Sequence, residues 1–153
     1  MSERLSAAWE AFMTAPEEQT PDYSNLEGIG CIPDLADVEE AQMVRVIDGD
    51  SIEVLLDGEK FEVRYIGINT PEYYSDERDA AIKATDANKK LLAGKTIYMF
   101  RDHSNTDNYG RLLRYVLTDD AFVNLELVRE GFAKAREYPP DTACHELFEK
   151  AAQ

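Results

Sequence analysis

Residues 42–72 read QMVRVIDGDSIEVLLDGEKFEVRYIGINTPE, and they give the clearest indication of the fold. Three apolar runs, at 43–47, 51–56 and 59–68, are separated by two Asp-Gly pairs at 48–49 and 57–58. Asp-Gly between runs of strand-forming residues is a strong signal for a β-hairpin, because both residues tolerate the positive φ of a tight turn. The stretch therefore predicts a meander of three antiparallel strands.

Polar side chains stand at the ends of these expected strands. Asp48 and Asp50 lie in the first turn, Arg64 lies in the third strand, and residues 69–72 (Asn-Thr-Pro-Glu) follow it. Carboxylate, amide and carbonyl oxygens are ligands of calcium, and the planar guanidinium group of arginine binds phosphate. Taken alone, each of these residues is more typical of an ordinary turn or a solvated strand than of a binding site. Gathered at one end of a meander, they indicate a site for a cation and a phosphate.

The remainder of the chain predicts two more strands and three helices. The helices are expected at 79–92 with Asp79 as N-cap, near 124–131 with Asn124 as N-cap, and from Asp141 onward. The strands are expected at 96–100 and 111–117. The resulting order, βββαββαα, predicts an α+β fold that is mainly β, a five-stranded barrel of the OB type.

The first forty residues differ in composition from the remainder. Residues 1–40 contain ten acidic residues and one basic residue, a net charge of −9 out of −15 for the whole chain. We predict an acidic N-terminal arm over 1–40, in which Leu5, Ala8, Trp9 and Phe12 have the spacing of a short helix, and one domain over 41–153. An acidic protein attracts nucleic acid poorly, so any chemistry on a polyanion requires a locally positive cleft.

The two cysteines, Cys31 and Cys144, leave two alternatives open. They lack zinc-ligand spacing, so they either form a disulfide that ties the arm to the last helix or remain free thiols. A disulfide in a chain whose signal peptide has been removed would place the protein outside the cell or in the cell envelope, and free thiols would place it in the cytoplasm. No apolar run is long enough to cross a bilayer, so we expect no membrane partner. We also expect a monomer.

A second polar cluster is Asp107-Asn108-Tyr109-Gly110-Arg111, which precedes the fifth expected strand. Arg111 is either a surface arginine beside a turn or a second phosphate ligand that faces Arg64. Four motifs in order, VIDGDS at 46–51, RYIGINTPE at 64–72, DNYGR at 107–111 and VNLELVREG at 123–131, resemble the staphylococcal nuclease-like (thermonuclease) family. The resemblance covers about residues 42–150.

The resemblance implies an OB-fold endonuclease that uses one Ca²⁺ ion, hydrolyses phosphodiester bonds of DNA and RNA, and leaves 3′-phosphate ends. Matching positions imply catalytic roles for Arg64, Glu72 and Arg111, and calcium ligands from Asp50, Asn69 and the Thr70 carbonyl. They also imply a supporting role for Asp48 and substrate contact by Tyr109.

Asn69 departs from the family pattern, which has an aspartate at this position. An amide oxygen can still bind calcium, but the site has one negative charge fewer, which weakens cation binding. Two hypotheses follow from the sequence. One is an active calcium-dependent nuclease, and the other is a catalytically weak or inactive OB-type module that binds nucleic acid or protein.

Overall fold

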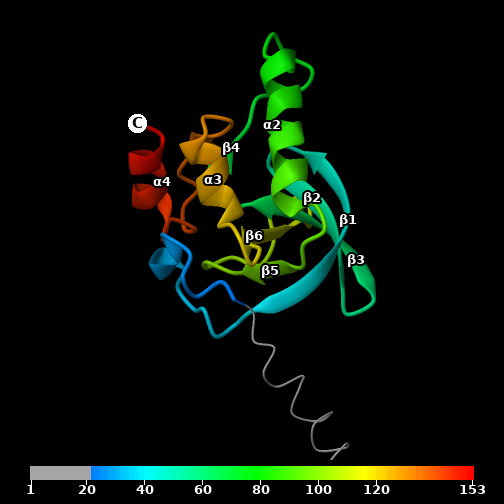
Figure 1. Cartoon of the computed structure of the whole chain (residues 1–153), viewed down its shortest axis with the longest axis vertical. Helices are drawn as coiled ribbons and strands as arrows, with labels where there is room; N and C mark the ends of the chain where they lie inside the picture. Colours follow the sequence, from blue (N-terminus) through cyan, green and yellow to red (C-terminus); the bar gives the residue numbers. More distant parts are fainter. Residues whose placement is uncertain (1–21) are drawn as a thin grey trace, which may run out of the picture.

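The computed structural model describes residues 22–153, so the helix expected from Leu5, Ala8, Trp9 and Phe12 lies outside the described residues. Five strands close into a barrel in the order β1-β2-β3-β6-β5, and three helices pack outside it (Figure 1). The strands are β1 (Glu39–Asp48), β2 (Ser51–Leu56), β3 (Glu59–Tyr65), β5 (Ile97–Phe100) and β6 (Leu112–Leu117). This confirms the predicted OB-type barrel of mainly β structure.

The meander forms as the Asp-Gly signals predict. Asp57 and Gly58 have φ values of 51° and 82°, so both turn residues are left-handed, as a two-residue type I′ hairpin requires. Gly49 in the first turn serves a different purpose, because a Cβ there would lie 2.7 Å from the Cβ of Ala84 and 2.8 Å from Cγ2 of Thr70. The absent side chain allows the following helix to approach the turn closely.

The third strand is shorter than the predicted range 59–68. Gly67 has a φ of 79°, which interrupts the extended chain, and β3 ends at Tyr65. After this break, β4 (Ile68–Asn69) leaves the barrel and pairs with β7 (Lys134–Ala135). A Cβ at position 67 would lie 2.8 Å from the Phe148 ring, so the absence of a side chain at Gly67 also makes room for the last helix.

The helices are α2 (Arg78–Leu92), α3 (Val123–Arg129) and α4 (His145–Ala151). The predicted N-caps were wrong. Asp79 and Asn124 lie inside the first turns of their helices. The predicted start of the last helix at Asp141 was also wrong, because α4 begins four residues later, at His145. Asp141 instead accepts hydrogen bonds from the backbone N–H groups of His103 and Ser104, at 2.9 and 2.7 Å, and so fixes a neighbouring loop.

Asn124 ties α3 to the barrel. Its Oδ1 accepts a hydrogen bond from the Val116 N–H, and its Nδ2 donates to the Ile66 carbonyl, each at 2.9 Å. The side chain is fully buried, so these two bonds satisfy groups that would otherwise be unpaired in the core. An asparagine near an expected helix start resembles an N-cap in sequence, but here it joins β6 to the end of β3.

The segment before β1 packs on the barrel. A short helix, η1 (Ile29–Cys31), brings Cys31 to Cys144, and the two form a disulfide with a Cα–Cα distance of 5.1 Å. Tyr23 packs on the rings of Tyr98 and Phe100, with centroids 5.2 and 5.6 Å apart. The division of the chain at residue 40 remains a prediction, and residues 22–40 contribute buried side chains to the core.

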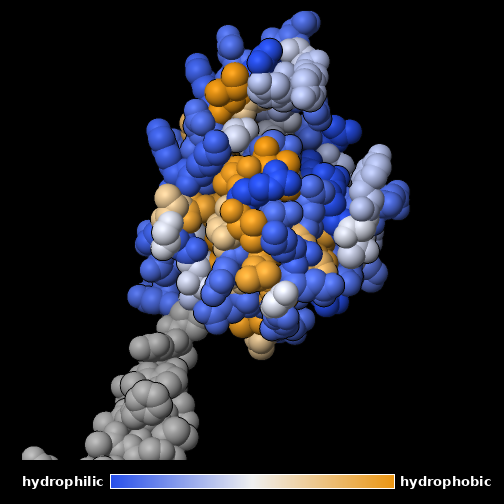
Figure 2. All heavy atoms as spheres, turned by 90° about the vertical axis from the view of Figure 1, so that its right-hand side faces the viewer, coloured by the Kyte–Doolittle hydropathy of each residue, from blue (hydrophilic) through white to orange (hydrophobic). Residues whose placement is uncertain are grey.

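Hydrophilic residues cover most of the face shown in Figure 2, and hydrophobic side chains show as separate patches from its upper part to its lower edge. Within residues 22–153, no helix combines the length and the apolar character needed to span a bilayer.

Candidate functional site

The centre of the site is an ion pair between Asp50 and Arg64. Asp50 follows the first turn of the meander and Arg64 lies in β3, directly opposite Ser51 in the register of β2 and β3. Arg64 Nη2 lies 3.2 Å from Asp50 Oδ2, and the Thr70 N–H donates to the same oxygen at 2.9 Å. Both side chains are mostly buried, with 13% of Arg64 and 9% of Asp50 exposed. The pair is therefore held in a fixed geometry.

The break after β3 fixes the Arg64 guanidinium. Nη1 donates to the carbonyls of Tyr65 and Ile68, at 2.9 and 3.0 Å, and Nη2 donates to Asn69 Oδ1 at 3.3 Å. Because Gly67 bends the chain, carbonyls one and four residues along the sequence converge on one side chain. Arg64 thus keeps its position without a bound anion, and little rearrangement is needed when one binds.

Asp48 shapes the turn that presents Asp50. Its Oδ1 accepts hydrogen bonds from the Asp50 N–H at 3.1 Å and from the Ser51 hydroxyl at 2.6 Å. Asn88 of α2 supports the same turn, because its Nδ2 donates to the Asp48 carbonyl at 2.9 Å and its Oδ1 accepts from the Tyr65 hydroxyl at 2.7 Å. Sequence reasoning missed Asn88. The sequence does contain a signal for it, because Asn88 is a polar residue on the same helix face as Ala81, Ala84 and Leu92, which are buried.

Burial raises the pKa of Asp50 to about 6, an effect that the Arg64 charge opposes and the nearby Asp48 charge reinforces. The ionised carboxylate is thus poorly solvated, and a cation beside it would replace the lost hydration. The oxygens of Asp50, Asn69 and the Thr70 carbonyl are of the chemical kind that binds a hard cation such as calcium. Among the described residues, no three His, Cys, Asp or Glu side chains gather as a metal site.

Arg111 is held in place by Asp107. Asp107 Oδ2 lies 2.8 Å from Arg111 Nε, and Asp107 Oδ1 accepts from the N–H groups of Arg111 and Tyr109, at 3.0 and 2.9 Å. Partial burial opposes ionisation of Asp107, but these hydrogen bonds prevail and lower its pKa. Sequence reasoning placed Asp107 in the cluster without recognising that it orients Arg111.

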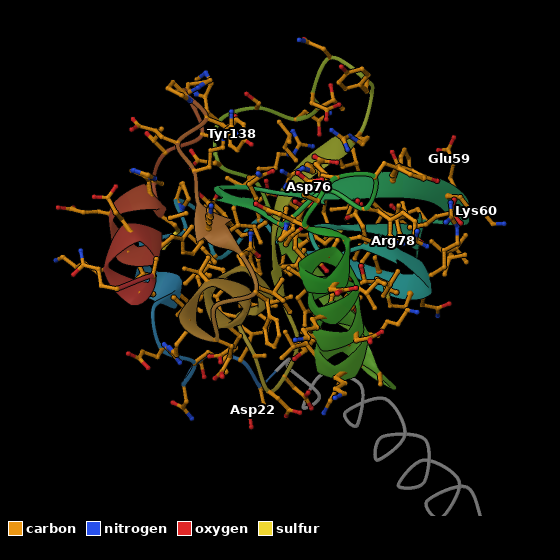
Figure 3. The ribbon with its side chains drawn as sticks, turned by 90° about the horizontal axis from the view of Figure 1, so that it is seen from above. Asp22, Glu59, Lys60, Asp76, Arg78 and Tyr138 are labelled. Carbon is orange, nitrogen blue, oxygen red and sulfur yellow. A yellow bond between two sulfur atoms is a disulfide. The ribbon has the colours of Figure 1, made fainter. Side chains whose placement is uncertain are left out.

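One cavity of about 560 Å³ joins the two arginines. Its lining includes six of the predicted site residues, namely Asp48, Asp50, Arg64, Glu72, Tyr109 and Arg111. The other two, Asn69 and Thr70, border an adjoining hollow with Glu72. Tyr138, which the sequence did not indicate, also lines the cavity, and its ring centroid lies 5.9 Å from the Arg64 guanidinium carbon (Figure 3). Fixed guanidinium groups and carboxylates around one cavity can bind a phosphate and position water beside it.

Comparison with known proteins finds a family model and several relatives that match this chain. Residues 62–153 match the family model described as staphylococcal nuclease homologue. The chain is 37% identical over 110 residues to a thermonuclease of Staphylococcus intermedius and 34% identical over 119 residues to that of Staphylococcus hyicus. It is 40% identical over 109 residues to Endonuclease YncB of Bacillus subtilis. These matches cover 70%, 76% and 68% of this chain and 66%, 70% and 52% of the respective relatives.

Proposed function

Because the chain belongs to the staphylococcal nuclease family, we propose that it is a calcium-dependent endonuclease that hydrolyses DNA and RNA to 3′-phosphate ends. Relatives named thermonuclease and endonuclease support phosphodiester hydrolysis. The observation that carries the proposal is the cavity that Arg64, Arg111, Asp50 and Glu72 line together. These residues come from four separate segments, and the barrel directs them to one place.

Arg64 and Arg111 bind the non-bridging oxygens of the target phosphate. Each guanidinium is already held by acceptors of the chain, at the break after β3 and at Asp107. Fixed donors stabilise the extra negative charge that develops when phosphorus becomes five-coordinate, without reorganisation during the reaction. Planar, charge-assisted hydrogen bonds to phosphate also fix its orientation.

Glu72 orients the attacking water and accepts its proton. The preceding Pro71 restricts the backbone, and the Glu72 carbonyl accepts a 2.7 Å hydrogen bond from the Ser75 hydroxyl, which fixes the loop. The water oxygen bonds to phosphorus while the bond from phosphorus to the 5′ oxygen breaks. The 5′ oxygen leaves as an alkoxide that takes a proton from solvent water and becomes a hydroxyl, and Glu72 returns the proton it accepted to the solvent. The phosphate stays on the 3′ side.

Asp50, Asn69 and the Thr70 carbonyl would hold the calcium ion, with Asp48 supporting the turn beneath Asp50. When bound, calcium supplies positive charge that offsets the charge of the phosphate. The amide of Asn69 carries no charge, so we expect calcium affinity to be lower than with an aspartate at this position.

Degradation of denatured DNA and of RNA, with calcium and then with excess chelator, tests the proposal. We expect cleavage that requires calcium, ends that carry 3′-phosphate, and large losses in Arg64→Ala and Glu72→Ala. A binding module without catalysis would cleave neither substrate at any calcium concentration and would be indifferent to Glu72→Ala. That outcome would refute the nuclease assignment.

The disulfide supports an oxidising location, and we propose that the protein acts outside the cell or in the cell envelope as a monomer. Sedimentation equilibrium and fractionation of the native host test these two statements.

A further inference from the structure

A second hollow meets the cavity of the two arginines at the carboxylates. It has a volume of about 380 Å³ and shares Asp48, Asp50 and Glu72 with the first cavity. From there it extends along α2, where Tyr73, Tyr74 and the helix side chains line it. Tyr138 at the first cavity and Arg78 beside the second hollow lie well apart in Figure 3. The carboxylates therefore stand where two hollows join.

Tyr74 is the most exposed large hydrophobic residue of the described chain, with 98% of its surface accessible. Its neighbour Tyr73 is held by Arg78, whose Nη2 lies 2.6 Å from the Tyr73 hydroxyl and whose guanidinium carbon lies 4.5 Å from the ring centroid. The Tyr73 and Tyr74 rings meet edge to face, with centroids 5.0 Å apart and an interplanar angle of 87°. Tyr74 thus rests on a supported ring while its own surface stays open.

We propose that Tyr74, supported by Tyr73 and Arg78, stacks an unpaired base of the nucleic-acid strand adjacent to the scissile phosphate. The proposal deepens the nuclease function and rests on it. An endonuclease must accommodate the strand on both sides of the phosphate, and the second hollow provides the side that the arginine cavity does not. Aromatic rings stack on every base, so this contact gives affinity without sequence preference.

Two properties of the chain favour base stacking over phosphate binding in this hollow. The net charge of −15 weakens electrostatic capture of a polyanion, so uncharged contacts must contribute more of the affinity. Lys89 lines the hollow, but Asp86 lines it as well, and together they supply no net positive charge. A single exposed tyrosine on a loop would be unremarkable. This one lies two residues after Glu72 and rests on a second ring that an arginine holds.

Base stacking on Tyr74 requires a base that is not paired. The bases of a duplex are already stacked inside the helix, and moving one onto a protein ring costs the stacking and pairing that it had. We therefore expect Tyr74 to favour single-stranded over duplex substrates.

Binding of a fluorescently labelled single-stranded oligonucleotide, measured by anisotropy with calcium in a Glu72→Gln background, tests the proposal. Tyr74→Ala should raise Kd by about 5- to 100-fold, while Tyr74→Phe should stay within about two-fold because it keeps the ring. Val44→Ala is the matched control, since Val44 is 40% exposed and lines neither hollow. Affinity for a duplex of the same sequence should not depend on Tyr74.

Equal Kd values for Tyr74→Ala and its parent would overturn the proposal, as would an equal loss in Val44→Ala or with the duplex. The melting temperature should not change in Tyr74→Ala, because the side chain buries almost no surface. Cleavage by the unmodified protein judges the nuclease function separately. If that protein binds single strands through Tyr74 but never cleaves, the nuclease function fails and the stacking contact stands.

Discussion

Removing the charge of Asp50 should stabilise the protein while weakening its binding of calcium. Burial raises the pKa of Asp50 from 3.8 to about 6, so the folded protein holds this proton more tightly than the unfolded chain does. The stabilisation that the folded protein gains from this tighter proton binding is fully present below pH 4 and is lost as the pH rises through 6. The difference between the unfolded and folded pKa values of Asp50 corresponds to about 3 kcal/mol of lost stability at pH 7. The folded pKa already reflects the attraction of Arg64. Asparagine resembles the protonated acid in shape and can still accept from the Thr70 N–H.

We therefore expect Asp50→Asn to raise the free energy of unfolding at pH 7 without calcium by about 3 kcal/mol. Urea denaturation of both proteins, with chelator, at pH 7 and near pH 3.5 measures the effect. The advantage of the variant should nearly vanish at the lower pH, where Asp50 is largely protonated in both the folded and the unfolded state. Added calcium should stabilise the unmodified protein more than the variant, because a ligand that binds only the folded state stabilises it.

The exposed Asp37 provides the control, and Asp37→Asn should change stability by less than about 0.5 kcal/mol at either pH. The reasoning would be refuted if Asp50→Asn were less stable than the parent protein at pH 7 without calcium. A stability difference that was the same at both pH values would also refute it, because the effect would then not arise from the charge.

Three further changes test other parts of the site and fold. Arg111→Ala should lower kcat/KM by about 100- to 1,000-fold through loss of one fixed donor to the phosphate, with unfolding by urea unchanged within about 1 kcal/mol; full activity would remove Arg111 from the mechanism. Asn69→Asp should lower the Kd for calcium in isothermal titration, because it restores one negative charge, and an unchanged or higher Kd would count against Asn69 as a ligand. Cys31→Ser should reduce the free energy of unfolding by about 4–5 kcal/mol, since the disulfide closes a loop across a separation of 113 residues. Chemical reduction of the unmodified protein should produce the same loss. Equal stability before and after reduction would contradict the disulfide.

Local signals in the sequence were sufficient for most of the barrel. The turn at Asp57 and Gly58 depends on the backbone preferences of those two residues, and the strands around it depend on alternation of apolar side chains. The strands β5 and β6 begin within one residue of the positions that the sequence predicts. The motifs around Asp50, Arg64 and Arg111 indicated residues that line one cavity in the structure. The signal was chemical, because few types of side chain bind a phosphate or a hard cation.

The sequence could not supply contacts between distant segments. Asn124 resembles a helix cap until Ile66 and Val116 are seen beside it, and Asn88 resembles an ordinary helix residue until Tyr65 and Asp48 lie against its two ends. Such roles depend on groups 8 to 58 residues away, whose positions follow only from the closed barrel.

Turn preferences and alternation act over a few residues, so the mainly β barrel, with carboxylates and arginines at strand ends, can be predicted from the sequence alone. The pairing of Cys31 with Cys144, the one cavity shared by Arg64 and Arg111, and the second hollow lined by Tyr74 become visible only in the folded chain. The reason is physical: a disulfide, a cavity and a shared rim depend on the distances between segments, and packing of the whole core sets those distances.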